Sequence, residues 1–557
     1  MDLTSLLAVL AELRGQLLPA RFEKAQQPTA QVLQLGLRSL QGLHWLELSW
    51  QAEAPRLHGV AAPPRQGDGS TLAQQLQHGL RGLALVALEQ QGWERVVELG
   101  FARRPGDPIE RWLVLELMGR HSNLFLLDEA RQVIALARQV RQQQSRLRPI
   151  GTGDPYQCPP PLQGDPPDPS ESLAQWRRRL ELQDLPLAQA LLRSYQGVSP
   201  ALVQQLLEVL PSAGGAELSV RQLPDASWEL LHQRWQQWLL CLSQQRFGFE
   251  RQGDRYRCWP AQAFAAAAAP CNAGVAAYYA EILGQRRFVE LQQQAGHRLE
   301  QLQQREREQL KQQQELLAAG EQADALQQQA DALLCQAHQD PTAVEQAQAL
   351  YRRARRLRRS GAVIGERIAL HNQRLQWLEA SATYVEQAES LSALEPVLAD
   401  LQTGLDDDAP SQRRRRRQGP PQDQPQPLEL ASPGGLRLQV GRNHRQNAWI
   451  SLRQARRGDL WFHAQECPGS HVVLKASAGV CGDADVAAAA HLAAYFSRAR
   501  GNGRVPVVMV PTDALQRIPG SPPGTVRHSG GTVLWGEPAQ ARALLASAPS
   551  LQAEERP

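Results

Sequence analysis

The sequence has few cysteines, few lysines and no long hydrophobic run. Its seven cysteines are scattered over 557 residues and form no CxxC pair and no cluster with histidine. This odd number argues against a disulfide framework and against a zinc site, so we expect reduced thiols and no metal. No stretch approaches the roughly 20 apolar residues that cross a bilayer. Asp2 stands where a signal peptide needs positive charge, so we expect a cytoplasmic protein with no membrane partner.

Lysine is nearly absent. Of 60 basic residues, only Lys24, Lys311 and Lys475 are lysines, and the others are arginines. Codon bias in a GC-rich genome would produce this composition, although the planar guanidinium of arginine also suits phosphate recognition. With a formal net charge of +4, the composition permits a nucleic-acid partner without requiring one.

The length predicts several domains, because single cores stop growing near roughly 250–300 residues. Turn signals separate the strand-like runs 32–35, 44–48, 96–99 and 112–117, which follow an N-terminal segment with leucines at helical spacing (Leu6, Leu7, Leu10, Leu13 and Leu17). Pro, Gly and Asp gather at 151–169, which we interpret as a linker. The expected fold class is multidomain α+β. Its segments are 1–169 (mixed α/β), 170–246 (compact helical), 247–287 (a connection returning to the first region), 288–403 (long helices), 404–428 (a disordered linker), 429–545 (α+β) and 546–557 (a tail).

A helix–hairpin–helix pattern lies within the compact helical segment. We expect one helix to stop near Gly197 and the next to begin with Ser199 as its cap and Pro200 in its first turn. Such a hairpin turns backbone N–H groups toward a phosphate. Two ordinary packed helices share this pattern, so both interpretations stay open.

The segment 288–403 is polar, with apolar residues spaced three or four apart on either side of a break at 338–342, among them Leu291, Leu299 and Leu378. This spacing predicts an antiparallel coiled-coil arm. The arm carries six arginines between Arg352 and Arg359. They could form a solvated face, but we favour contact with RNA or the ribosome, through Arg352, Arg353, Arg355 and Arg356. To the run 413–417, next to three aspartates at 406–408, we assign only an auxiliary role.

Several motifs are not explained by the helix, strand and turn patterns described above. They are Glu116–Asp128 (ELMGRHSNLFLLD), Gly441–Asn447 (GRNHRQN), Asp459–His463 (DLWFH), Pro468–Val473 (PGSHVV), and Asp340-Pro341 followed by Ala347-Gln348 and Tyr351. Together they closely resemble the NFACT family of ribosome-associated quality-control factors, which are also known as fibronectin-binding-protein-A-like. The resemblance runs nearly end to end.

The resemblance implies an NFACT-N domain, a helix–hairpin–helix domain, a coiled-coil module and a C-terminal NFACT-R domain. It also implies binding to large ribosomal subunits obstructed by peptidyl-tRNA. Family members in bacteria recruit alanyl-tRNA, so that the stalled chain gains a template-free alanine tail that marks it for degradation. The ribosome makes the peptide bond, so the resemblance implies a tRNA-positioning factor that is not an enzyme and has no cofactor, with tRNA and rRNA as partners and no DNA.

The family's tRNA-binding signature is an Asp-Arg pair just before a strand, and Glu94-Arg95 stands at the matching place. The carboxylate is therefore kept, one methylene further from the backbone. Other arginine, histidine and asparagine side chains suit RNA loops, which are read by hydrogen bonds and stacking. Each could instead be a turn, cap or core residue. The candidates are Glu94, Arg95, Arg120, His121 and Asn123 for tRNA, and Arg442, Asn443, His444, Arg445, His463 and His471 for RNA or the ribosome.

Three other functions compete with this one. A scaffold that binds RNA or ribosomes without tailing would need the same side chains. A fibronectin-binding adhesin would need an export route that the sequence does not suggest. A DNA glycosylase of the formamidopyrimidine type, whose fold the family's N-terminal part resembles, would need an N-terminal proline followed by glutamate, and the chain begins Met1-Asp2-Leu3.

Overall fold

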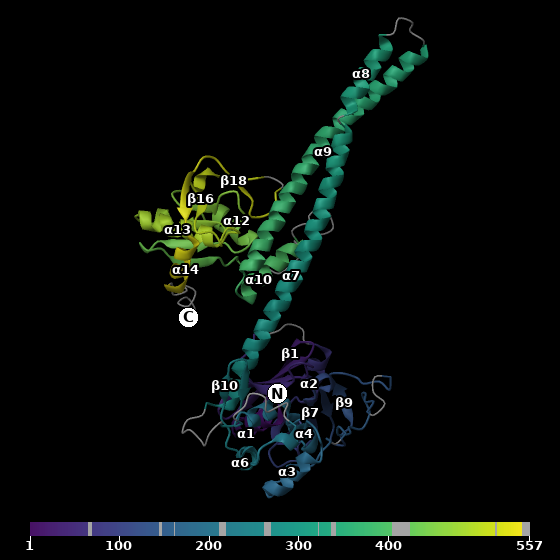
Figure 1. Cartoon of the computed structure of the whole chain (residues 1–557), viewed down its shortest axis with the longest axis vertical. Coiled ribbons are helices and arrows are strands. Elements are labelled where there is room, and N and C mark those ends of the chain that lie inside the picture. Colours follow the sequence, from purple (N-terminus) through teal and green to yellow (C-terminus); the bar gives the residue numbers. More distant parts are fainter. Residues whose placement is uncertain are drawn as a thin grey trace. The chain divides into compact units, whose positions relative to one another are not determined.

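The computed structural model shows a multidomain protein of mixed α/β architecture. It describes residues 1–64, 70–143, 148–160, 162–210, 219–260, 269–320, 322–335, 341–403, 424–518 and 521–547. The chain divides into two compact units, Met1–Ile282 and Leu283–Pro557 (Figure 1). Three parts of the predictions lie outside the described residues: positions 338–340 of the predicted helix break at 338–342, most of the predicted linker with its arginine run, and the end of the tail.

The first unit is built on a nine-stranded antiparallel sheet in the order β4-β3-β2-β1-β5-β6-β7-β8-β9. Helix α1 (Leu3–Leu17) buries its predicted leucine stripe, and α2 (Thr71–Gly79) packs near β1. The strands predicted near residues 32, 44, 96 and 112 are confirmed. The strands are β1 (Ala20–Thr29), β2 (Val32–Ser39), β3 (Gly42–Ser49), β4 (Arg56–Val60), β5 (Ala84–Gln90), β6 (Val96–Ala102), β7 (Arg111–Glu116), β8 (Asn123–Leu127) and β9 (Val133–Leu136).

Four helices around a tryptophan-rich core complete most of this unit. They are α3 (Leu173–Glu181), α4 (Leu187–Ser194), α5 (Pro200–Leu207) and α6 (Asp225–Gln244). The core holds Trp176, Trp228, Trp235, Trp238 and Trp259, all buried. Such large aromatic surfaces supply much of the burial energy of a small helical domain.

The hairpin β10 (Glu250–Gln252) and β11 (Arg255–Arg257) leads to α7 (Cys271–Gly320), which extends into the second unit. The start of α7 is tied to α1, because the backbone N–H groups of Cys271 and Asn272 donate to the Glu12 carboxylate at 2.6 and 2.9 Å. A carboxylate near a helix N-terminus is also favoured by the helix dipole.

Long helices form one part of the second unit: α7, α8 (Gln322–Leu334), α9 (Pro341–Gln387) and α10 (Leu391–Thr403). Helices α7 and α9 run antiparallel, since Gln292 Nε2 donates to the carbonyl of Val385 at 3.2 Å and His371 Nδ1 lies 2.7 Å from Glu306. Their shared core includes the predicted seam residues Leu291, Leu299 and Leu378.

The C-terminal part of this unit is a six-stranded antiparallel sheet in the order β12-β13-β15-β14-β16-β19. Side chains alternate between its two faces, so Phe462 packs with α13 whereas Trp461 packs with Ile450 of α12. The elements are β12 (Leu428–Ala431), β13 (Arg437–Val440), α12 (His444–Leu452), β14 (Leu460–Ala464), β15 (Val472–Leu474), α13 (Asp483–Tyr495), β16 (Val505–Pro511), β17 (Leu515–Arg517), β18 (Val526–His528), β19 (Thr532–Gly536) and α14 (Pro538–Ser547).

The sequence has strand-like runs at 436–440, 460–463, 471–475, 505–510 and 532–535, and the five strands that they predict are confirmed. It also predicts a helix capped by Asp483 or Asp485 and running to about Arg498, but α13 has Gly482 as its N-cap residue and ends at Tyr495. The Asp485 carboxylate reaches back to the Gly482 N–H at 2.9 Å and also accepts from Ser432 at 2.6 Å. Among the helices that the structure describes, none is both long and apolar enough to cross a membrane.

Candidate functional site

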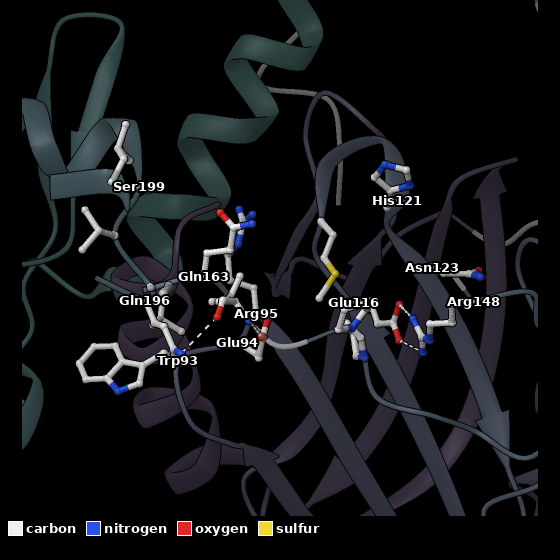
Figure 2. Close-up of a pocket in the computed structure, with 18 of the residues that line it drawn as sticks. Trp93, Glu94, Arg95, Glu116, His121, Asn123, Arg148, Gln163, Gln196 and Ser199 are labelled. Atoms are coloured by element: carbon white, nitrogen blue, oxygen red, sulfur yellow. Dashed lines mark hydrogen bonds and ion pairs between the residues drawn. The ribbon is translucent and has the colours of Figure 1, made fainter. Parts of the chain in front are cut away.

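A cavity of about 670 Å³ lies in the first unit, where the sheet meets the turn between α4 and α5 (Figure 2). Its wall is formed by five stretches distant in sequence. They are the entry to β6 (Trp93–Arg95), the end of β7 with the 3-10 turn η1 (Gly119–His121), the start of β8, the segment 148–163, and the turn Gln196–Pro200. The stretch 151–169 was interpreted as a linker, but its first part is a wall of this cavity.

Arg95 is half-buried at the cavity. Its Nη1 donates to the main-chain carbonyl of Met1 at 3.2 Å, and its own carbonyl accepts from the Leu117 N–H at 2.9 Å. A guanidinium carries five N–H donors. Within the described residues, Met1 is the only hydrogen-bond acceptor of this side chain, so the other donors are available to a ligand.

Glu94 helps to hold the cavity wall together. Its carboxylate accepts from the Leu162 N–H at 3.1 Å and forms no ion pair with Arg95 in the described part of the chain. Burial raises the pKa of Glu94 above its ordinary value, and the nearby Glu116 charge adds to this, while the bond from Leu162 and the charge of Arg95 oppose it. The longer side chain of glutamate thus connects β6 to the segment 148–163.

A buried ion pair holds the same segment at its other end. Arg148 donates to both oxygens of Glu116, at 2.6 and 2.9 Å (Figure 2). The Tyr156 hydroxyl also donates to Glu116, at 2.9 Å. Glu116 is only 1% exposed. Burial and the Glu116 charge raise the pKa of Tyr156 well above its usual range. Sequence reasoning missed Arg148 and Glu116 as site residues, although Glu116 opens the first motif.

The other tRNA candidates differ in exposure. Arg120 and His121 are exposed on η1, with Arg120 Nε 3.1 Å from His121 Nε2. Asn123 is only 3% exposed, and its amide is used internally: Nδ2 donates to the carbonyl of Arg138 at 2.7 Å, and Oδ1 accepts from two backbone N–H groups. His121 and Asn123 line the cavity, whereas Arg120 does not.

The turn between α4 and α5 has the predicted cap. Ser199 Oγ accepts from the Leu202 N–H at 3.1 Å, and Pro200 occupies the first turn of α5. Ser199 also donates to Asp2, the N-cap residue of α1, at 3.3 Å. Gly197 adopts φ +73°, and a β-carbon there would lie 2.7 Å from Leu3 and 2.8 Å from Trp93. Only glycine fits this turn, which forms one edge of the cavity.

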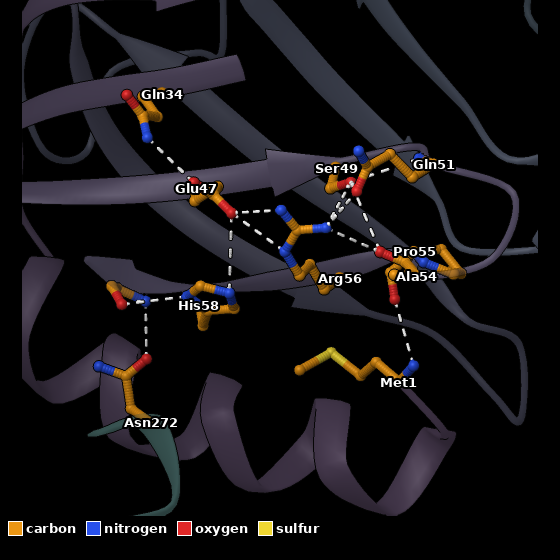
Figure 3. A network of polar contacts seen from close by, with 11 residues as sticks. Met1, Gln34, Glu47, Ser49, Gln51, Ala54, Pro55, Arg56, His58 and Asn272 are labelled. Carbon is orange, nitrogen blue, oxygen red and sulfur yellow. Dashed lines mark hydrogen bonds and ion pairs between the residues drawn. The ribbon is translucent and has the colours of Figure 1, made fainter. Parts of the chain in front are cut away.

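A buried polar network joins Met1 to strands β3 and β4 (Figure 3). Arg56 donates to Glu47 on β3 at 2.7 Å and to the carbonyl of Ala54 at 3.0 Å. The next residue, Pro55, accepts from the amino group of Met1 at 3.2 Å. Because the carbonyl of Met1 accepts from Arg95, this network fixes the backbone against which the Arg95 guanidinium rests.

The candidates of the second unit mostly hold the fold together. Asn443 caps α12 through the Gln446 N–H at 2.9 Å, and Arg445 pairs with Asp400 on α10 at 2.5 Å. Arg442 is half-buried and its Nε has no hydrogen-bond partner among the described residues. Burial lowers its pKa.

Of the three histidine candidates, His444 and His471 are buried and His463 is half-buried. His444 stacks on Trp377 with ring centroids 4.5 Å apart, bonds to Ser381 at 2.8 Å, and has a pKa lowered to about 3 by burial. His471 lies 2.8 Å from Ser451 Oγ, and burial lowers its pKa well below the ordinary value. Burial also lowers the pKa of His463 to about 4.

The arm candidates are arranged differently. Arg352, Arg353, Arg355 and Arg356 are all exposed on α9. Of the six neighbouring arginines, Arg358 forms the one ion pair seen within the described residues, with Asp324 at 2.6 Å. No group of three or more potential metal-ligating side chains occurs in the described ranges.

The fold is multidomain and of mixed α/β class, and the chain belongs to the NFACT family. The family model described as NFACT N-terminal and middle domains matches residues 2–341 and 339–418. Two relatives, each named Rqc2 homolog RqcH, are similar over nearly the whole length. The one from Streptococcus pneumoniae serotype 2 is 27% identical over 94% of this chain and 95% of its own. The one from Bacillus subtilis is 25% identical over 93% and 94%.

Solved structures that resemble parts of the chain come from the fibronectin/fibrinogen-binding protein of Streptococcus suis. Its C-terminal part is 27% identical and covers 46% of this chain and 98% of its own, with a TM-score of 0.38. Its N-terminal part is 21% identical and covers 50% and 99%, with a TM-score of 0.39.

Proposed function

We propose that this protein is a ribosome-associated quality-control factor. It binds large ribosomal subunits obstructed by peptidyl-tRNA and recruits alanyl-tRNA, so that the stalled chain gains a C-terminal alanine tail without a template. Family membership and the end-to-end likeness to proteins named as Rqc2 homologues support the quality-control role. The protein positions tRNA and the ribosome forms the peptide bond.

The observation that carries the tRNA assignment is the composition of the 670 Å³ cavity. It brings the Arg95 guanidinium together with exposed His121 and with the hairpin turn that begins α5. Cavities of this size accept a small ligand or one unstacked base rather than a duplex. Single-stranded loops of RNA are recognised in this way, by hydrogen bonds and by stacking on aromatic or guanidinium planes.

The two arginines that line the cavity, Arg148 and Arg95, differ in whether a carboxylate neutralises them. Glu116 is neutralised by Arg148, whereas Arg95 has no carboxylate partner in the described part of the chain. The Arg95 guanidinium therefore keeps its positive charge for a ligand, and a phosphate or a base edge of tRNA is its natural partner. Arg120, exposed on η1 outside the cavity, extends the contact toward the RNA backbone.

Two measurements in the same host strain test the proposed function. Affinity purification of the full chain from lysate should recover large subunits with peptidyl-tRNA, and a non-stop reporter should carry C-terminal alanine by mass spectrometry. Arg95→Ala should abolish the tail and leave subunit recovery intact, whereas Arg104→Ala, an exposed arginine of the same unit, should preserve both.

The outcomes separate the alternatives. Subunits recovered with no tail, in the unmodified protein, would favour a ribosome-binding scaffold. Recovery of neither subunits nor tRNA would refute the proposal. A tail that persists in Arg95→Ala would refute the site while leaving the function.

A further inference from the structure

The C-terminal sheet of the second unit has an exposed apolar edge at β19. This strand is the outermost of the six, and it pairs with β16 in a register without a bulge. Val533 is 48% exposed and Trp535 is 62% exposed. Leu534, between them, packs against the core that the sheet shares with α13. One face of the edge therefore presents two apolar side chains to solvent.

The backbone groups of the same two residues point away from the sheet. In an antiparallel sheet, successive residues direct their N–H and C=O groups alternately to the neighbouring strand on one side and on the other. The carbonyl of Pro506 accepts from the Gln465 N–H at the end of β14, at 2.8 Å, so Pro506 is directed toward β14. Val508, two residues further on, shares this direction. Their partners on β19 are Trp535 and Val533, whose N–H and C=O groups are therefore directed to the open side.

Strand β19 has none of the features that usually protect such an edge. Natural edge strands commonly carry a charged side chain, a proline or a bulge, each of which hinders pairing with another strand. Residues 532–536 are Thr-Val-Leu-Trp-Gly, and their register with β16 is regular. The strand at the opposite edge of the sheet, β12, contains the charged Glu429. An unprotected edge with exposed apolar side chains is suited to the addition of a further strand.

A second copy of β19 matches this edge in one register. When two β19 strands pair antiparallel about Leu534, Val533 of each copy lies opposite Trp535 of the other. Each such pair exchanges two hydrogen bonds, so all the outward N–H and C=O groups of both residues find partners. Pairing about Val533 or about Trp535 would leave the other residue unpaired. The preferred register also places a β-branched side chain beside an aromatic one, a stabilising cross-strand pair, and no charged side chain of β19 opposes it.

We propose that the protein forms a homodimer through β19, in which two copies of the six-stranded sheet join edge to edge about Leu534. The interface is isologous, since the same strand contributes on both sides. Because the strand is short, the contact is small, and we expect a transient dimer that forms as the concentration rises. This inference goes beyond the proposed function and does not depend on tRNA or ribosome binding.

Sedimentation velocity of the full chain over roughly a hundredfold range of micromolar concentrations tests the dimer. The average mass should rise with concentration from that of the monomer toward twice that value. Hydrogen exchange at both ends of the range should show slower exchange at Val533 and Trp535 in the concentrated sample. A protein that stays monomeric throughout, or a dimer whose exchange within 532–536 is unchanged, would overturn the proposal.

Two substitutions at one position test the interface. Val533→Pro removes an N–H that points away from β16, so the sheet should keep its melting temperature. Dimerisation should weaken by about tenfold or more, because each copy loses a hydrogen bond. Val533→Lys should have a similar effect by placing a charge at the edge. Val480→Lys, at an apolar position of the same unit that is 94% exposed, is the matched control and should dimerise normally. Unchanged dimerisation in both Val533 variants would refute the interface.

A synthetic peptide of residues 531–537 distinguishes a second copy from any other extended chain. The peptide should bind the monomer and inhibit dimerisation, whereas a scrambled peptide of the same composition should do so much less, since it loses the matching register. Equal inhibition by the two peptides would show that the edge accepts extended chains in general, and would overturn the assignment to a second copy.

Discussion

Arg95 donates from Nη1 to the main-chain carbonyl of Met1 across 3.2 Å. The amino group of Met1 in turn donates to the carbonyl of Pro55, next to the buried Arg56. The candidate tRNA-binding guanidinium is thus oriented by backbone rather than by a carboxylate, and it keeps its charge and most of its donors for a ligand.

The planar shape of this side chain should matter as much as its charge. Arg95→Lys keeps a cation but replaces the five-donor fork by an ammonium that makes no bidentate contact. We expect tRNA affinity to fall at least tenfold, measured by fluorescence anisotropy with labelled tRNA, and thermal stability to change little. Arg104→Lys serves as the matched control. Equal affinity in Arg95→Lys would mean that the site recognises only charge.

The length of the Glu94 side chain should hold the cavity wall. Glu94→Asp moves the carboxylate back by one methylene and should break its 3.1 Å bond with the Leu162 N–H. The loss should cost about 1 kcal/mol of unfolding free energy and speed proteolysis within 148–163. Glu94→Gln retains an acceptor at the same reach and should cleave like the unmodified protein. Equal protection of Glu94→Asp would show that the bond does not hold the segment.

Two serine caps allow a matched comparison. Ser199→Ala removes the cap of α5 at the cavity, and Ser172→Ala removes the cap of α3, whose capping box lies away from it. Each should cost about 1 kcal/mol in denaturant unfolding. Only Ser199→Ala should also weaken tRNA binding. If both variants bind tRNA equally, the hairpin turn is a packing element alone.

The exposed arginines of α9 should appear in the salt dependence of ribosome binding. Arg352→Gln with Arg355→Gln removes two cations that have no ion pair within the described residues. The slope of log affinity against log salt should become shallower by roughly one for each phosphate that the variant no longer neutralises. The pair Arg305→Gln with Arg307→Gln, exposed on α7, is the control. An unchanged slope in the α9 variant would favour a solvated face.

His444 should make the second unit sensitive to acid. Its pKa is about 3 in the folded protein, below the ordinary 6.5, so the unfolded chain binds the proton first as pH falls. Stability is lost progressively from about pH 6.5 downward, by about 2 kcal/mol at pH 5 from this residue. His444→Phe should remove that part of the loss in urea unfolding at pH 7 and pH 5. His463 and His471, whose pKa values are also lowered, should leave a remainder. An identical loss in the variant would refute this role.

Local chemistry explains what the sequence predicted well. The Ser199 cap, the leucine stripe of α1 and the alternating strands around Phe462 each depend on neighbours a few residues away, so pattern alone identifies them. The apolar seams of α7 and α9 also follow from local spacing, because residues three or four apart share one face of a helix.

Such local patterns could not predict contacts between residues that are distant in the chain. Arg148 meets Glu116 32 residues away, and nothing near either residue signals the pair. His444 was chosen for its motif, but its ring is enclosed by Trp377 and Tyr384 of α9. The proline-rich stretch was taken for a linker because its bonds to the sheet, from Leu162 and Tyr156, are tertiary.

That stretch also changes what binding costs. Pro159 and Pro160 line the cavity, and the ring of each fixes its own φ. A wall restrained in this way has already lost much of its conformational entropy in the free protein, and less remains to be lost when a ligand arrives. The cavity is therefore preorganised, and more of the contact energy of a bound ligand can appear as affinity.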